Sequence, residues 1–163
     1  EVEVEIPPGV TSDNYITLRG KGHAGPQGGP AGDLIVLLEI QEDERFARDG
    51  ANLLHEYPIT FAQAALGDEV EIPTVEGTAR VSIPAGVQSG AHLRLRGQGL
   101  PELHGNGHRG DLLVRILVYT PQKLTPEARE LFHHLREVEE PAPSKIEGER
   151  KGFWSKVKEA FVG

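Results

Sequence analysis

The sequence predicts a mainly β protein, with two tandem small β-sandwich or barrel-like domains of related topology and a helical segment after them. Three observations lead to this fold class. Apolar and polar residues alternate along much of the chain, as they do in strands with one wet face. The 20 glycines and 12 prolines interrupt these runs, so the elements are short. One long segment also occurs twice.

The duplicated segment begins at an Ile-Pro turn. Residues 6–22 read IPPGVTSDNYITLRGKG, and residues 83–99 read IPAGVQSGAHLRLRGQG, 77 positions later. After a loop, residues 32–40 (GDLIVLLEI) match residues 110–118 (GDLLVRILV) at an offset of 78. Two copies are too few for a solenoid, so two tandem β domains are the better interpretation.

Each element follows from a local pattern. The run EVEVEI (1–6) is expected to be a half-buried strand, and the continuous apolar run at 33–40 a strand covered on both faces. The other expected strands are 15–20, 52–60, 68–75, 78–87, 91–97 and 111–120. Helices are expected at 60–67, ended by Gly67, at 125–140, begun by Thr125 and Pro126, and at 151–163.

These elements group into four parts. They are a partial first β domain (1–48), a second β domain (49–121), a C-terminal helix (122–140), and a linker with an amphipathic tail (141–163). The tail places Phe153, Trp154, Val157 and Phe161 on one helical stripe. Because so short a helix is marginal alone in water, it must dock on its own domain, a second subunit or a membrane surface. We favour a second subunit and expect a homodimer.

The glycines of GKGHAG (20–25) fit the spelling of a phosphate-binding loop. The third glycine has no counterpart in the second copy, and the loop leads to a strand instead of opening a helix. A dinucleotide fingerprint needs that helix, because its N-terminus holds the pyrophosphate. We therefore read Gly20, Gly22, Gly97 and Gly99 as backbone turns. Asp33 and Asp111, each after a glycine, are expected to close those turns through backbone amides.

Composition argues against several function classes. The net charge is −8, without a basic stripe, which argues against nucleic-acid binding. There is no cysteine and no apolar run near the ~20 residues of a membrane span. His104 and His108 flank a loop, but no third metal ligand is evident. No nucleophile motif or isolated carboxylate pair indicates an enzyme.

Phe46 stands out in the charged turn DERFARDGANL, between the two copies. Two interpretations stay open for an aromatic residue in such a place. Its ring caps the end of the β barrel, or it lines a groove that receives a peptide.

The order and spacing of the motifs closely resemble one known family. These motifs are VEIPPGV, LRGKG, GPAGDLIV, F-x-R-D-G-x-N-L, ITFAQAALGDEVEIPTVEG, IPAGVQSG, LRGQGLP, GDLLVRI and TP, over residues 1 to about 140. They resemble the C-terminal client-binding region of bacterial DnaJ co-chaperones, and the tail KGFWSKVKEAF is similar to tails of that family.

The resemblance implies a cytoplasmic co-chaperone that holds unfolded client polypeptides for a DnaK-type ATPase and dimerises through its C-terminus. It implies no enzymatic activity, no membrane and no nucleic acid. The family's J domain and its C-x-x-C-x-G-x-G repeats are missing from this sequence, so neither ATPase stimulation nor a zinc cofactor is expected of it. The opening strands of the first domain are also missing, which leaves a small core.

Carried over residue by residue, the client site implied by the resemblance contains Phe46, with Val2, Val4 and Ile6 on an adjacent strand. Dimerisation falls to the tail stripe. The alternative function is a structural β module that docks to a partner or a membrane through its C-terminal amphipathic helix.

Overall fold

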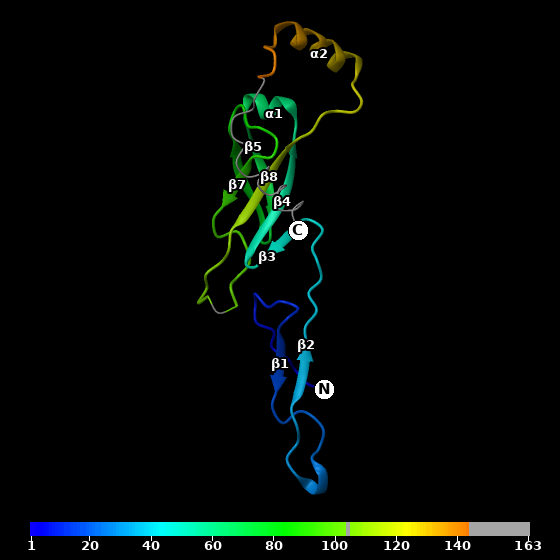
Figure 1. The fold of residues 1–163 in the computed structure, drawn as a ribbon, viewed down its shortest axis with the longest axis vertical. Coiled ribbons are helices and arrows are strands. Elements are labelled where there is room, and N and C mark those ends of the chain that lie inside the picture. Colours follow the sequence, from blue (N-terminus) through cyan, green and yellow to red (C-terminus); the bar gives the residue numbers. More distant parts are fainter. Residues whose placement is uncertain (104, 144–163) are drawn as a thin grey trace, which may run out of the picture. The chain divides into compact units, whose positions relative to one another are not determined.

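The computed structural model describes residues 1–103 and 105–143. This part of the chain is mainly β and ends with a helix, which confirms the predicted fold class (Figure 1). The elements in chain order are β1 (Tyr15–Leu18), the 3-10 turn η1 (Pro26–Gly28), β2 (Leu34–Leu37), β3 (Ala47–Asp49), β4 (Asn52–Ile59), α1 (Phe61–Leu66), β5 (Asp68–Thr74), β6 (Gly77–Ile83), β7 (His92–Leu95), β8 (Leu112–Val118) and α2 (Pro126–Val138).

The chain forms two compact units, Glu1–Thr120 and Pro121–Gly163. All the described strands belong to the first unit, and α2 belongs to the second. The boundary expected between residues 48 and 49 falls inside β3, which pairs with β4.

Three sheets make up the first unit. β1 and β2 form an antiparallel hairpin, β5 and β6 form another, and the third sheet has the order β3-β4-β8-β7. In this third sheet β4 and β8 run parallel, while β3–β4 and β7–β8 are antiparallel pairs. The second sequence copy therefore places its last strand, β8, between two neighbours.

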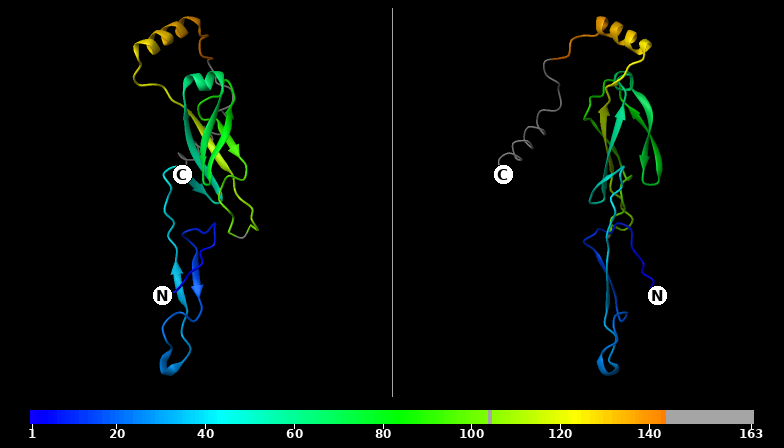
Figure 2. Two further views of the ribbon diagram at one scale, coloured as in Figure 1. Left: turned by 180° about the vertical axis from the view of Figure 1, so that it is seen from behind. Right: turned by 90° about the vertical axis from the view of Figure 1, so that its right-hand side faces the viewer.

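One hydrophobic core stabilises the second copy. The β5–β6 hairpin packs its apolar residues against those of the four-stranded sheet, and Figure 2 shows the two layers side by side. The buried members are Phe46, Leu53, Ile59, Ala64, Val70, Ile72, Ile83, Leu112, Val114 and Ile116. Alternation along β4, β5 and β8 positions these side chains, since every second residue of a strand faces the same side.

Both described helices begin where the sequence predicts. The side chain of Thr60 accepts a hydrogen bond from the Gln63 amide and Gln63 bonds back, a capping box that fixes the start of α1. Gly67 ends α1 with a positive φ of 77°. The Thr125 hydroxyl accepts from the Ala128 amide at 3.2 Å and begins α2.

Two strand predictions are wrong in detail. Residues 1–6, expected as a strand, form none, although their alternation is perfect. The internal repeat gives the reason. Residues 78–83, their counterparts, lie in β6, and β6 has β5 as its partner. The described chain offers residues 1–6 no such neighbour, and an unpaired strand leaves its backbone groups without partners.

The second difference concerns β2. Its apolar run predicted cover on both faces, but alternate residues are exposed, with Ile35 and Leu37 facing solvent. A continuous apolar run indicates that both faces of a strand can be buried. Whether they are buried depends on the neighbouring elements.

Candidate functional site

The two glycine loops share one set of hydrogen bonds. The Gly20 amide donates to Asp33 Oδ1 at 2.8 Å, and the Gly97 amide donates to Asp111 Oδ1 at 2.7 Å. These bonds confirm that the repeated Gly-Asp pair closes a turn. Gly20 has a positive φ of 66°, which explains the glycine. The motif that resembled a phosphate loop is therefore structural.

The electrostatics of the second loop follow from its contacts. The backbone hydrogen bond from Gly97, and then the guanidinium of Arg94, hold the pKa of Asp111 below its ordinary value. Arg94 Nε donates to Asp111 Oδ2 at 2.6 Å. The carboxylate thus braces the loop most strongly when it is ionised.

A second duplicated bond ties the far end of each copy. The Ile40 amide donates to the Ser12 hydroxyl at 3.0 Å, and the Val118 amide donates to the Ser89 hydroxyl at 3.0 Å. The strand-loop-strand part of the first copy thus shares two polar contacts with the second copy, although Thr17 stands where the second copy has Arg94.

Equivalent apolar residues differ in exposure between the two copies. Ile6 is 57% exposed, whereas its counterpart Ile83 is 2% exposed. The inward residues of β8 are fully buried, but their counterparts in the first copy are only half-buried. The pairs are Leu112 with Leu34, Val114 with Val36, and Ile116 with Leu38.

The outer side of the β1–β2 hairpin exposes three apolar residues, Tyr15, Ile35 and Leu37, and we call it the open face. Tyr15 pairs with Leu37 across the hairpin, so these two side chains lie side by side. Of the predicted client residues outside the hairpin, Val2 and Ile6 are exposed, while Val4 is half-buried.

Phe46 occupies a different environment. It is 8% exposed and belongs to the core of the second copy, which contains none of Val2, Val4 and Ile6. Its ring centroid lies 5.5 Å from that of His55, and the Arg45 guanidinium carbon lies 5.0 Å above the ring. This geometry favours the interpretation in which Phe46 caps the end of the β domain.

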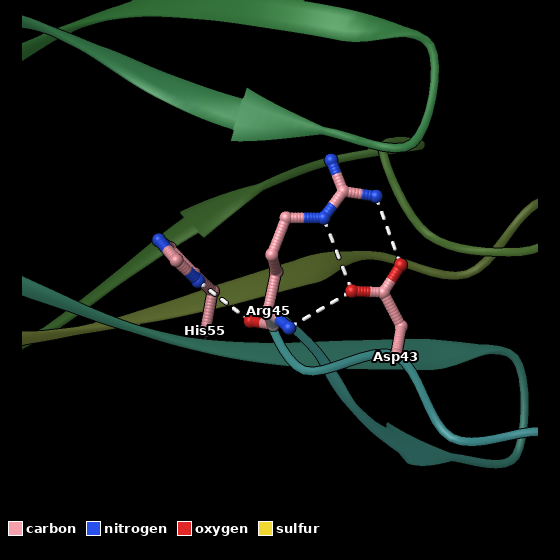
Figure 3. Close-up of polar contacts among 3 residues, drawn as sticks. All are labelled: Asp43, Arg45 and His55. Carbon is pink, nitrogen blue, oxygen red and sulfur yellow. Dashed lines mark hydrogen bonds and ion pairs between the residues drawn. The ribbon is translucent and has the colours of Figure 1, made fainter.

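A polar clamp holds the turn that carries Phe46 (Figure 3). Arg45 donates from Nε to Asp43 Oδ1 at 3.0 Å and from Nη2 to Oδ2 at 2.8 Å. His55 Nδ1 lies 2.8 Å from the Arg45 carbonyl oxygen. The hydrogen bonds from Arg45 lower the pKa of Asp43 to about 2. The clamp therefore persists at neutral pH.

The second unit exposes a separate apolar stripe. No described residue of α2 is buried, and Leu131, Leu135 and Val138 are exposed at helical spacing. The predicted dimerisation residues Phe153, Trp154, Val157 and Phe161 lie outside the described residues.

The described residues show neither a metal-binding cluster nor a membrane-spanning helix. No group of three or more His, Asp or Glu side chains could hold a metal ion there. Within the same part of the chain, neither helix is long and apolar enough to cross a membrane.

The DnaJ C terminal domain family model matches residues 1–121. This chain belongs to the DnaJ C-terminal domain family. Relatives named "Chaperone protein DnaJ" match nearly the whole chain. The protein of Brevibacillus choshinensis is 44% identical over 163 residues, 100% of this chain and 43% of the relative. That of Roseiflexus sp. (strain RS-1) is 45% identical over 99% of this chain and 43% of its own length. The Salinibacter ruber protein is 43% identical over 98% and 41%.

This DnaJ C-terminal domain chain therefore spans less than half the length of these relatives. Membership explains the order of the motifs. Sequence reasoning missed Tyr15, Ile35 and Leu37. The internal repeat could have identified Leu37 as exposed, because Leu37 is the counterpart of the exposed Arg115 in the second copy.

Proposed function

We propose that this chain is the client-binding part of a co-chaperone. It binds exposed apolar segments of unfolded proteins by strand addition and holds them for handover to a DnaK-type ATPase. Family membership supports the chaperone role, and the open face supports the mode of binding. An added strand gains backbone hydrogen bonds that ignore sequence, which suits a protein with many clients.

The observation that carries the proposal is the open face, where Tyr15 and Leu37 are exposed at the positions of His92 and Arg115 in the second copy. Burial of a leucine or isoleucine side chain contributes about 1.5–3 kcal/mol, so a client segment that covers the open face is stabilised without any enzyme chemistry.

Within this proposal, Val2, Val4 and Ile6 keep the client-contact role inferred from the sequence. The ring of Phe46 is buried in the core of the second copy, so little of it is accessible to a client. Its client role therefore ranks below that of the open face.

The proposal includes a homodimer held by the tail stripe of Phe153, Trp154, Val157 and Phe161. The exposed stripe on α2 is a second surface that a subunit could cover. Two client sites in one dimer raise the effective concentration of each site without any new contact.

We propose a cytoplasmic protein that needs no zinc or other cofactor. It binds neither nucleic acid nor a membrane. The net charge of −8 supports the exclusion of nucleic acid, because phosphate contacts need clustered cations.

The first test measures how well the chain suppresses aggregation of a chemically denatured client. Leu37→Ser removes an apolar side chain from the open face. We expect it to raise the concentration needed for half-maximal suppression by roughly five- to tenfold. Leu66→Ser is the matched control, since Leu37 and Leu66 are both 80% exposed and Leu66 lies on α1. Equal loss in the two variants would show that general surface hydrophobicity, and not the open face, binds the client.

A structural module that docks through an amphipathic helix is the second candidate, and the bare stripe on α2 favours it. Flotation with liposomes separates the two functions. The co-chaperone stays in the unbound fraction, whereas a membrane-docked module floats with the vesicles.

A further inference from the structure

The Ile-Pro-x-Gly-Val turns of the two copies are anchored in different ways. In the second copy the Gly86 amide donates to the Ala64 carbonyl at 2.8 Å, so that turn is bonded to α1 of its own copy. In the first copy the carbonyl groups of the turn accept hydrogen bonds from Arg48, which lies in β3. Because β3 pairs with β4, the first turn is attached to the sheet of the second copy.

The guanidinium of Arg48 joins three carbonyl oxygens. Nη1 donates to the Val10 carbonyl at 2.8 Å, and Nη2 donates to the Gly9 carbonyl at 2.9 Å. Nε donates to the Gly50 carbonyl at 2.8 Å, which holds the side chain beside the turn that follows β3. A guanidinium presents its donors in a rigid planar fork, so one side chain can fix both ends of this contact.

Gly9 lies directly against a loop of the second copy. A Cβ atom at this position would be 2.4 Å from the Pro101 carbonyl oxygen and 2.9 Å from the Leu103 amide nitrogen. Gly9 also has a φ of 90°, a conformation that favours glycine. Its counterpart Gly86 has a similar φ of 79°, but among the described residues only its chain neighbours lie within 4 Å of its Cβ position. The two turns share a conformation, and the first one alone needs glycine for space as well.

The burial of Val10 agrees with this contact. Val10 is 8% exposed, whereas its counterpart Val87 is half-buried. The other equivalent pairs compared above show the reverse, with Ile6 more exposed than Ile83. The turn is thus covered where it meets the second copy, and both copies lie in the compact unit Glu1–Thr120.

We propose that Arg48 and Gly9 form a latch that fixes the orientation of the first copy on the second. The guanidinium holds the turn, and the absence of a side chain at Gly9 lets residues 101–103 approach it. Residues 38–42, which join the copies along the chain, adopt neither helix nor strand, so the orientation depends on contacts outside this segment. The inference concerns the geometry of the two copies and holds whether or not the chain binds clients.

The latch has a consequence for motion. Neighbouring domains move relative to one another by default, unless their interface is large and hydrophobic. The contacts at this turn are mainly hydrogen bonds and a close backbone approach. Loss of the Arg48 donors should therefore release the first copy to move about residues 38–42, while each copy keeps its own fold.

Distances between two spin labels, measured by double electron–electron resonance, test the latch, and the chain has no cysteine to interfere. The between-copy pair is Thr17→Cys on β1 with Ser82→Cys on β6, both at exposed positions. The within-copy pair is Ser82→Cys with His92→Cys on β7. An excess of unlabelled chain removes distances between subunits. With Arg48 and Gly9 intact, each pair should give a single narrow distribution of distances.

Substitution of Arg48 tests the hydrogen bonds. Arg48→Met removes the donors, so the between-copy pair should lose its single narrow peak while the within-copy pair keeps it. Arg48→Lys should give an intermediate width, because an ammonium keeps the charge but not the planar fork. Arg80→Met is the matched control, since Arg80 forms an exposed ion pair within the second copy at 4.0 Å. That control should leave both distributions unchanged.

Substitution of the two turn glycines tests the close approach. Gly9→Ala places a methyl group against the Pro101 carbonyl, so the between-copy distances should shift. Gly86→Ala imposes a similar backbone strain without that clash. It should leave the between-copy distances unchanged.

Three outcomes would contradict the latch. Unchanged between-copy distances in both Arg48→Met and Gly9→Ala would overturn it. Equal shifts in Gly9→Ala and Gly86→Ala would assign the effect to strain within the turns. Broadening of both pairs in Arg48→Met would show that Arg48 stabilises the second copy itself, through its bond to Gly50.

Discussion

At the scale of single residues, the two copies differ in how far equivalent apolar side chains are exposed. The same Gly-Asp and Ser contacts occur in both copies, whereas the Arg94–Asp111 contact occurs in the second copy alone. The positions that differ are the apolar ones that need cover. Ile6 stays exposed while Phe46, which the sequence offered as a client contact, is buried in the core. The sequence singled out Phe46 but could not determine whether its ring would pack in the core or line a groove.

Truncation of Phe46 tests its structural role. We expect Phe46→Ala to lower the free energy of unfolding by about 3 kcal/mol, because it leaves a cavity beside His55 and Leu53. Urea unfolding followed by circular dichroism measures the change. Leu37→Ala, at an exposed position, should change stability by less than about 0.5 kcal/mol. A fully stable Phe46→Ala chain would show that the ring is dispensable for the core.

The pKa of Asp111 makes the second copy sensitive to acid. The hydrogen bond from Gly97 and the contact with Arg94 lower this pKa in the folded state. Its stabilising contribution is therefore complete above the unfolded carboxyl pKa of about 4 and is lost as the pH falls through the lowered folded value. We expect the unfolding free energy of an Asp111→Asn chain to fall less between pH 6 and pH 3. Parallel pH profiles for the two chains would contradict this assignment.

At the scale of elements, alternation predicts which side of a strand is apolar, and capping residues predict where the helices begin. Thr60, Gly67 and Thr125 act locally, so those boundaries were readable from the sequence. The short strand Ala47–Asp49 was missed because its charged residues show no apolar alternation. Residues 1–6 were wrongly expected to be a strand, because pairing depends on a partner that alternation does not reveal.

At the scale of the whole molecule, the duplication was visible in the sequence and largely predicts the fold. It could not show by itself which apolar residues of the first copy are exposed in the described part of the chain. Even so, the alignment of Leu37 with Arg115 was a usable signal. Arg115 forms an ion pair with Glu56 in the sheet, and no such partner is described for Leu37. Comparison between copies is thus more informative here than either copy alone.

The proposed dimer is also tested on the whole chain. We expect removal of residues 141–163 to give monomers in sedimentation velocity, because the proposed tail stripe is lost. Leu131→Ser combined with Leu135→Ser removes the exposed stripe of α2 while the tail stays intact. That variant should remain dimeric. A dimer of the truncated chain would assign the contact to another surface, and monomers of the α2 variant would add that helix to it.

The paired loop contacts of the first copy have a thermodynamic consequence. The Gly20–Asp33 bond holds one end of the β1–β2 hairpin and the Ile40–Ser12 bond holds the other, so its backbone is ordered before any ligand arrives. An incoming segment then loses its own conformational entropy, but the receiving strand loses little more. Because of this preorganisation, even a short segment can bind, and a weakly bound segment can dissociate quickly.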